Sequence, residues 1–433
     1  MKKILLLGAI SSFCDLVKEI DNLNYSPVIC DYYEDAPAKM MGYLSYNVST
    51  TDTDQLLNIV EKNGVDGIIS AFSDRNLMPA LELCLIKNKN FFFSKAIIEC
   101  LTDKKKMKQY FCDMGLPVIK YGVHSTEDIE NNILDYDFPV VTKPIDAYGS
   151  KGIYVCNDIA DIKKVLNHVI SQSVKYTNEI IIEEYYPVDE ISISAWVKDG
   201  KAYISCIYDV FRNSKGDVTL AAVSFPSKYT EKYLDKFSEL LNKSVAGLNI
   251  SEGPVTLQCF IGPKGIKVSE LLCRLAGGSP YLYPTYFGGP NIAKMVIQKS
   301  VNDDVDYQNV FSFTPTIPFE EVFYDIQIMV KHKGLIIHNL NENELKSKIN
   351  EIADLRVYYP SGSLLKNVGT SGVLFARVVC KTARDADYLR LIKRIDSMIN
   401  VQDENGNKIS FINTPERLDV VNTHNIDWSF LDC

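Results

Sequence analysis

A short segment in the first half of the chain combines the residue types that bind phosphate. Residues 139–152 read PVVTKPIDAYGSKG, in which two valines lead to Lys143 and then to a tip of small, hydroxyl and basic residues. The tip residues are Gly149, Ser150, Lys151 and Gly152. Glycines let backbone N–H groups approach a ligand closely, and such groups beside a lysine can hold a polyphosphate. The segment predicts a β-hairpin with a phosphate-binding tip, although an ordinary glycine hairpin with a solvated lysine explains the same residues.

A second segment joins a run of isoleucines to acidic and aromatic side chains. Residues 180–190 read IIIEEYYPVDE. An adenine ring needs an apolar slot with one or two hydrogen bonds at its edge, and this segment offers both. The same acidic residues are also typical of exposed strand ends.

Length, charge and composition limit the class of protein. A chain of 433 residues is long enough for about two to four domains, and its net charge of −9 disfavours nucleic acid and anionic membranes as partners. No apolar run reaches membrane-spanning length. The eleven cysteines form no CxxC pairs, which is typical of reduced core residues, and we therefore expect a cytoplasmic protein.

The periodicity of the chain changes near residue 100. The first hundred residues alternate between apolar strands and helices, which predicts a parallel sheet with helices on its faces. Their first turn reads GAISS and lacks the GxGxxG pattern, so an NAD-dependent enzyme is a weak alternative. A capped basic helix follows, and its lysines Lys105, Lys106 and Lys108 are by themselves typical of a solvated helix face. Beyond Pro318 the sequence predicts a further α/β segment.

The order of these segments along residues 1 to 300 resembles that of the ATP-grasp superfamily of carboxylate–amine and carboxylate–thiol ligases. The helix DKKKMKQYFCDMGLP resembles the family's helix before the ATP-binding subdomain, and its phosphate-contacting lysine matches Lys104. Lys143 matches the second ATP lysine, and the hairpin tip matches the loop that closes over the β- and γ-phosphates. The resemblance also implies the base and sugar contacts. Glu183 would take the adenine amino group in a hinge with Glu184 and Tyr186, and Glu190 would hold the ribose hydroxyls.

The resemblance implies a metal site on two later strands. Gln258 and Glu270 match the family's magnesium ligands, and Arg274 matches the arginine that contacts the transferring phosphoryl group. The family's asparagine ligand is replaced by Leu272, which has no ligand atom. Mg²⁺ keeps several water ligands and is also coordinated by substrate phosphates, so Gln258, Glu270 and ATP suffice for one Mg²⁺ ion. A second ion is in doubt.

The implied fold class is α/β, with α+β grasp subdomains. We expect an N-terminal parallel α/β domain at 1–100, an ATP-grasp domain at 101–310 and a C-terminal α/β domain at 311–433. Within the grasp domain, the ATP-binding subdomain would span about 125–200 and the metal-binding subdomain about 201–310.

The implied activity is an ATP-dependent ligase that forms an acyl phosphate and then an amide, with ADP and phosphate as by-products. The resemblance implies a small-molecule carboxylate and an amine as partners, an amino acid or an amino-acid-like substrate among them, with no nucleic acid and no membrane; a homodimer stays open. Candidate acceptor-pocket residues flank the metal strands, and loop packing explains them as well. They are Arg212, Tyr281, Tyr283, Tyr286, Gly288 and Gly289. The alternative function is a catalytically weakened, nucleotide-binding or regulatory module, which Leu272 favours.

Overall fold

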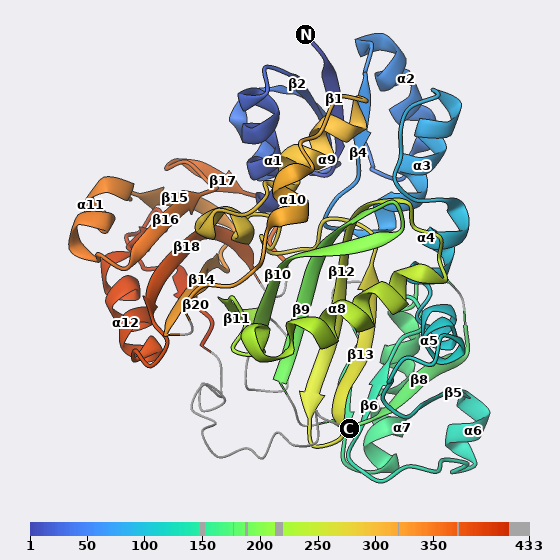
Figure 1. Cartoon of the computed structure of the whole chain (residues 1–433). Helices are drawn as coiled ribbons and strands as arrows, with labels where there is room; N and C mark the ends of the chain where they lie inside the picture. The colour runs from blue at the N-terminus through green and yellow to red at the C-terminus, as the bar shows by residue number, and fades with distance from the viewer. Residues whose placement is uncertain are drawn as a thin grey trace.

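The computed structural model describes most of the chain in four sheets and the helices around them (Figure 1). The described residues are 1–147, 152–175, 177–186, 189–212, 220–318, 320–369 and 372–414. The predicted tip residues Gly149, Ser150 and Lys151 lie outside these ranges.

The N-terminal segment forms a four-stranded parallel sheet, as its alternating pattern predicted. Its strand order is β3-β2-β1-β4, and the parallel pairing of β1 with β2 and β4 places the apolar run KILLL in the centre. The strands are β1 (Lys3–Leu7), β2 (Ser26–Cys30), β3 (Leu44–Tyr46) and β4 (Gly67–Ile69). The helices are α1 (Ser11–Asn22), α2 (Thr53–Asn63), α3 (Leu77–Ile86) and α4 (Lys95–Thr102).

A smaller antiparallel sheet carries the predicted hairpin. Its order is β5-β8-β6-β7, and Val140 of β6 pairs with Cys156 of β7, which confirms the hairpin strands on either side of the tip. Gly152 has a φ of +72°, and a Cβ there would lie 2.8 Å from Pro144, so glycine is required. The strands are β5 (Tyr121–Ser125), β6 (Val140–Lys143), β7 (Tyr154–Cys156) and β8 (Glu179–Glu184). The helices are α5 (Lys104–Asp113), α6 (Thr126–Glu130) and α7 (Ile159–Ser171).

A nine-stranded sheet connects the middle of the chain with its C-terminal segment. Its path is β13-β12-β9-β10-β11-β14-β18-β16, with β20 beside β14. The strands from the middle are β9 (Asp189–Lys198), β10 (Lys201–Arg212), β11 (Leu220–Phe225), β12 (Glu252–Gly262) and β13 (Gly265–Leu272). The C-terminal ones are β14 (Glu321–Val330), β16 (Ile352–Val357), β18 (Val373–Ala383) and β20 (Ser410–Ile412).

Helix α8 (Thr230–Ala246) covers one face of this sheet over β9, β10 and β12 (Figure 1). Phe237 and Leu241 of α8 pack with Ile193 of β9 and Leu257 of β12 in one buried cluster. The apolar side chains of β9 and β12 therefore point to α8, and their alternating partners, including Ser192 and Gln258, face the other way. The polar face is free to build a site.

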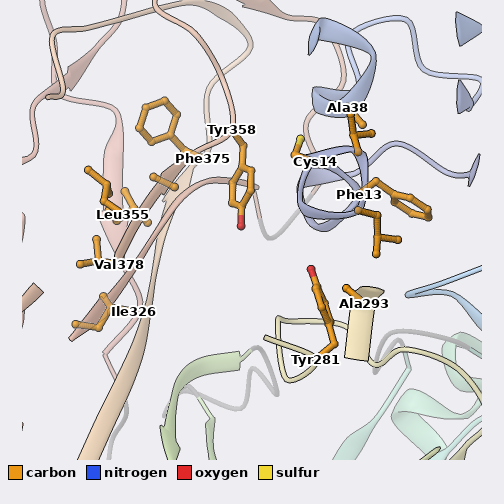
Figure 2. Packing of buried hydrophobic residues seen from close by; sticks show 14 of the residues in the cluster. Phe13, Cys14, Ala38, Tyr281, Ala293, Ile326, Leu355, Tyr358, Phe375 and Val378 are labelled. Atoms are coloured by element: carbon orange, nitrogen blue, oxygen red, sulfur yellow. The ribbon is translucent and has the colours of Figure 1, made fainter. Parts of the chain in front are cut away.

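The remaining elements complete the C-terminal part and join it to the N-terminal sheet. A three-stranded sheet is formed by β15 (Gly334–His338), β17 (Ser363–Leu365) and β19 (Val401–Gln402). Helix α11 (Glu342–Lys348) contacts β16 and helix α12 (Tyr388–Met398) contacts β20 of the large sheet. Helices α9 (Ile292–Ser300) and α10 (Gln308–Ser312) run back to α1, and Figure 2 shows Phe13, Ala293 and Tyr281 meeting there. Because one sheet continues past residue 310, the proposed domain division stays a prediction. Within the described ranges, no helix is long and apolar enough to cross a membrane.

Candidate functional site

The buried Lys108 and the half-buried Lys143 hold the carboxylate of Glu183 at the end of β8. Lys143 Nζ lies 2.5 Å from Glu183 Oε2, and Lys108 Nζ lies 2.5 Å from Oε1. Burial alone would raise the pKa of Glu183, but the two ammonium groups outweigh it and lower that pKa to about 2. The carboxylate is therefore ionised and fully engaged within the protein. Its predicted contact with adenine stays a prediction.

Lys108 is the member of this triad that the sequence pattern missed. Its side chain is 3% exposed, in contrast to the solvated helix face that the lysine run indicated. Helix α5 turns Lys108 inward on the side of Met107 and Phe111, both buried, whereas Lys105 pairs with Glu179 at the surface. The spacing of Lys108 from the apolar Phe111, three residues away, was the available signal.

Lys104 begins helix α5 and points to the segment that precedes the predicted phosphate loop. Its Nζ donates to the carbonyl oxygen of Ala147 at 2.5 Å, and its backbone N–H donates to Ile145 O at 3.1 Å. The capping carboxylate of Asp103, which accepts from Lys106 N at 3.1 Å, fixes this first turn. Lys143 therefore begins the segment 143–147 that leads toward the predicted loop, and Lys104 binds the backbone at the other end of that segment.

The hinge after β8 contacts the turn between β12 and β13. Tyr186 donates its hydroxyl hydrogen to Gly265 O at 2.9 Å and accepts from Lys264 N at 2.7 Å, while Glu184 forms an ion pair with Lys264. These contacts fix the small sheet against the large one where the two meet. The hinge residues Pro187 and Val188 lie outside the described ranges.

Glu190, the predicted ribose ligand, forms a two-point ion pair with Arg212 of the neighbouring strand. Arg212 Nε donates to Oε2 at 2.9 Å and Nη2 donates to Oε1 at 2.5 Å. Burial lowers the pKa of Arg212, but the carboxylates of Glu190 and Glu270 outweigh it and raise that pKa. Each Glu190 oxygen retains a lone pair for another donor, so a ribose contact is compatible with this pair.

The predicted metal ligands lie opposite each other on adjacent strands. Gln258 of β12 pairs with Glu270 of β13, and Ser192 of β9 pairs with Gln258 on its other side. Gln258 and Glu270 are half-buried on the polar face, and neither forms an ion pair or hydrogen bond with another described side chain. Two oxygen donors at one cross-strand position fit a single Mg²⁺ ion whose other ligands are waters and phosphates. The described ranges contain no group of three or more His, Cys, Asp or Glu side chains able to hold a metal without such help.

Leu272 is buried two residues after Glu270 on β13, on the same face of the strand. It is 6% exposed and pairs with Thr256, whose hydroxyl lies 3.1 Å from that of Ser194. Leu272 offers no ligand atom in the row beside Glu270, and the hydroxyl of Thr256 opposite it is already hydrogen-bonded to Ser194. The number of ions stays a prediction.

Arg274, the predicted catalytic residue, is bound to the N-terminal segment. Its Nε and Nη2 donate to the two carboxylate oxygens of Asp74 at 2.6 and 2.7 Å, and Nη1 donates to Leu275 O at 3.1 Å. Burial lowers the pKa of Arg274, but Asp74 and Glu270 outweigh it and raise that pKa. Asp74 lies in the 3₁₀ helix Asp74–Asn76, 200 positions away, and no local sequence pattern identifies it as the partner.

Glu270 lies between these charged groups. Helix α5 contacts β13 directly, because Leu271 N donates to Met107 Sδ at 3.4 Å. The carboxylate of Glu270 raises the pKa of Arg212 and of Arg274 and opposes the burial that lowers the pKa of Lys108. The candidate-pocket tyrosines donate to other carboxylates: Tyr281 to Asp15 at 3.0 Å, Tyr283 to Asp325 and Tyr286 to Asp354, both at 2.6 Å. Their role in an acceptor pocket stays a prediction.

One family model matches the central part of the chain. Residues 136–279 match the family model described as the ATP-grasp domain. The matched range includes the hairpin, Glu183, Glu190, both predicted metal ligands and Arg274.

The chain is similar to several known proteins over part or most of its length. It is 24% identical to a formate-dependent phosphoribosylglycinamide formyltransferase of Sulfurisphaera tokodaii, over 43% of this chain and 48% of that protein. The chain thus spans about half the length of the curated relatives it matches first. An L-amino acid ligase of Bacillus licheniformis has a TM-score of 0.71 at 15% identity, covering 94% of this chain and 99% of that one.

The fold is also similar to the biotin carboxylase domain dimer of a 2-oxoglutarate carboxylase from Hydrogenobacter thermophilus, whose structure holds MgADP and bicarbonate. Its TM-score is 0.73 at 16% identity, covering 92% of this chain and 89% of that chain. At these identities the two structural likenesses establish the fold alone.

Proposed function

Because the chain contains an ATP-grasp domain, we propose that it is an ATP-dependent ligase that activates a carboxylate and joins it to an amine. In the first step a carboxylate oxygen attacks the γ-phosphorus of ATP and ADP leaves, which gives an acyl phosphate. In the second step the amine attacks the acyl carbon, phosphate leaves, and the nitrogen loses a proton. No covalent protein intermediate is needed.

The register of β12 and β13 is the observation that carries this proposal. It sets Gln258 beside Glu270 on the polar face, with Lys108, Arg212 and Arg274 acting on the same carboxylate. A negative ligand held between carboxylate-bound metal and several cations is the arrangement that phosphoryl transfer requires. When bound, Mg²⁺ would neutralise charge on the phosphates.

The side chains would divide the work by position. Lys104 and Lys143 would contact phosphate oxygens on either side of the hairpin, with Gly152 and the undescribed tip closing the site. Glu190 would hold the ribose, and the hinge of Glu184 and Tyr186 would hold the adenine. Arg274 would stabilise the charge that develops on the transferring phosphoryl group.

Coupled nucleotide consumption tests this proposal. ADP release is measured with ATP, Mg²⁺ and pairs drawn from a panel of amino acids and other small carboxylates and amines, and products are identified by mass spectrometry. We expect ADP release only when a carboxylate and an amine are both present, with one condensed product per ADP. AMP in place of ADP, or ADP release that ignores both substrates, would contradict the proposed reaction.

A second candidate function is nucleotide binding with little or no turnover. The burial of Leu272 at 6% exposure and the two-point hold of Asp74 on Arg274 favour it, because both remove groups from the reaction. The two functions separate in one measurement. The binding protein would hold ATP and Mg²⁺ tightly and release no ADP with any substrate pair.

A further inference from the structure

A buried arginine in the C-terminal part of the large sheet has more donors than partners. Arg377 of β18 is 1% exposed, and its Nη1 donates to Asp325 Oδ2. Among the described residues, its Nε and Nη2 have no hydrogen-bond partner, and neither does Oδ1 of Asp325. Unpaired donors on a buried guanidinium are costly, so an acceptor must satisfy them in the working protein.

The free atoms of Arg377 form the edge that recognises two-oxygen groups. Nε–H and one N–H of Nη2 run parallel, which is the fork that binds a carboxylate with two hydrogen bonds. The other nitrogen, Nη1, is the one held by Asp325. The Nε and Nη2 edge of Arg377 is therefore available to a ligand while Nη1 stays bound to Asp325.

A further unpaired group lies on the strand next to Arg377. The hydroxyl of Tyr358, at the end of β16, is also buried without a hydrogen-bond partner among the described residues. Figure 2 shows the hydroxyls of Tyr358 and Tyr281 pointing toward one another, from the end of the C-terminal strands and from the loop after β13. Strand pairing places Tyr358 close to Arg377, because Arg356 of β16 pairs with Arg377 of β18 and Tyr358 N donates to Phe375 O at 2.9 Å.

The charge balance selects the ligand. Arg377 and Asp325 together are neutral, so an added dianion such as phosphate would leave net charge in a buried place. A zwitterion adds none: its carboxylate fits the free edge of Arg377, and its ammonium fits Oδ1 of Asp325.

The sheet connects this pair to the proposed reaction site. Asp325 pairs with Val223 of β11, Val223 pairs with Val210 of β10, and Tyr208 on that face of β10 pairs with Ser192. Asp325 and Arg377 therefore share the sheet face of Gln258 and Glu270. The loop after Arg274 leads to the same place, since Phe72 N donates to Leu275 O at 3.1 Å and the Phe72 ring lies 5.4 Å from that of Tyr281.

We propose that Arg377, Asp325 and Tyr358 form a binding site for the α-carboxylate and α-ammonium of a free amino acid. The assignment rests on the proposed ligase function, in which this amino acid is one of the two substrates.

Binding of defined probes tests the site. Thermal shift with the twenty standard L-amino acids, in the presence of Mg²⁺ and a non-hydrolysable ATP analogue, selects the best binder. Calorimetry then compares that amino acid with its α-amide, which lacks the carboxylate, and its N-acetyl derivative, which lacks the ammonium. We expect both derivatives to bind about tenfold or more weakly, the scale of one lost charge-assisted hydrogen bond.

Two variants locate the binding. Tyr358→Phe removes an unpartnered hydroxyl and should keep the fold while weakening the amino acid by about fivefold, the scale of one hydrogen bond. Tyr233→Phe in α8 is the matched control, because its hydroxyl is also buried and unpartnered among the described residues, and it should bind normally. The double change Arg377→Met with Asp325→Asn removes both charges together, so that neither remains unpaired, and should abolish amino-acid binding while ATP-analogue binding persists.

The outcomes separate the two proposals. Unchanged amino-acid binding in Tyr358→Phe and in the double variant would overturn the site, and so would a wild type that binds the ATP analogue but no amino acid. In both cases the ligase function would stand with a different substrate. A wild type that fails to bind the ATP analogue would instead overturn the ligase function.

Discussion

Glu183 shows how strongly the environment of one residue can differ from its place in a motif. Two acidic residues and two tyrosines in a row read as a hinge at the surface, yet Glu183 is 3% exposed and held by Lys108 and Lys143. The carboxylate of Glu183 and the two ammonium groups together carry one net positive charge. That excess positive charge favours a negatively charged group beside the half-buried Lys143, and Glu270 offsets part of it at Lys108.

Replacing Lys143 should therefore weaken nucleotide binding without unfolding the protein. Lys143→Met leaves Glu183 paired with Lys108, so no buried charge is left alone. We expect the affinity for a non-hydrolysable ATP analogue to fall about 10- to 100-fold, the scale of one hydrogen bond to a charged group. Lys105→Met is the control, because Lys105 is a surface lysine of the same region paired with Glu179, and calorimetry should find its affinity unchanged. Equal affinities in the two variants would remove Lys143 from the site.

The lowered pKa of Glu183 predicts a pH dependence of stability. Its folded pKa of about 2 lies below its ordinary value of 4.5, so the unfolded state takes up the proton first as the pH falls. The contribution of Glu183 is complete above pH 4.5 and is lost between 4.5 and about 2. In Lys108→Met the pKa of Glu183 rises, because one of its two cations is gone. Urea unfolding of wild type and variant should then differ most near neutral pH and converge as the pH falls through this window. A difference that grows toward low pH would contradict the ion-pair assignment.

At the scale of elements, the pairing of β12 with β13 decides what the metal face can hold. The register sets Gln258 opposite Glu270 and Thr256 opposite Leu272, with Ser192 and Ser194 of β9 continuing the two rows. The row of Gln258 and Glu270 has two side-chain oxygens of the kind that bind Mg²⁺. In the other row Leu272 lies opposite Thr256, whose hydroxyl is already hydrogen-bonded to Ser194. If Mg²⁺ binds on this face, the strands offer two oxygen ligands in the first row and none from Leu272 in the second.

Leu272→Asn should restore that ligand. If the protein is a one-metal ligase, an amide oxygen at this position should lower the Mg²⁺ concentration needed for half-maximal ADP release. Removing a buried leucine costs about 1–3 kcal/mol of stability, so Tm is recorded for each variant. Leu272→Ala is the matched control, since it loses the same apolar contact and gains no oxygen. An identical magnesium dependence in the two folded variants would show that no second ion site can be built on this face.

At the scale of the whole molecule, ion pairs tie the N-terminal segment to both other parts. Arg274 binds Asp74, and Arg356 of β16 binds Asp15 of α1 at 2.7 Å. Helix α9 follows the metal strands in the chain and packs against α1 and β4, which buries Phe13, Ala293 and Met295 in one shared cluster. The N-terminal sheet therefore helps to position Arg274 as well as covering it.

This arrangement predicts different effects for the two partners of the Arg274–Asp74 pair. Arg274→Ala should lower ADP release about 100-fold or more, the scale of losing one charge-stabilising donor, while ATP-analogue affinity stays close to that of wild type. Asp74→Asn keeps the arginine, which still donates to Leu275 O, and should cost less turnover. Steady-state rates and calorimetry on both variants check this order. Equal losses of binding and turnover in Arg274→Ala would make the arginine a structural residue.

The sequence by itself determined the features that depend on local order. Strand–helix alternation predicted the parallel N-terminal sheet, and β-branched runs around a glycine turn predicted the hairpin of β6 and β7, because periodicity and turn chemistry act over a few residues. The positions of Gln258 and Glu270 on neighbouring strands also followed, since a short Gly-Pro turn joins those strands. The tip of the hairpin and the roles of the site residues stay predictions.

Only the tertiary structure decided which charged groups meet. Lys108 is buried because β8 brings Glu183 beside α5, Arg274 is held by Asp74, and Arg377 has an unpaired edge among the described residues because its neighbours come from β14, β16 and the loop after β13. The partners in such pairs are separated by tens to hundreds of positions. A charged side chain reads the same in sequence whether it is solvated or enclosed, since the cost of burying it depends on which distant group arrives to compensate it.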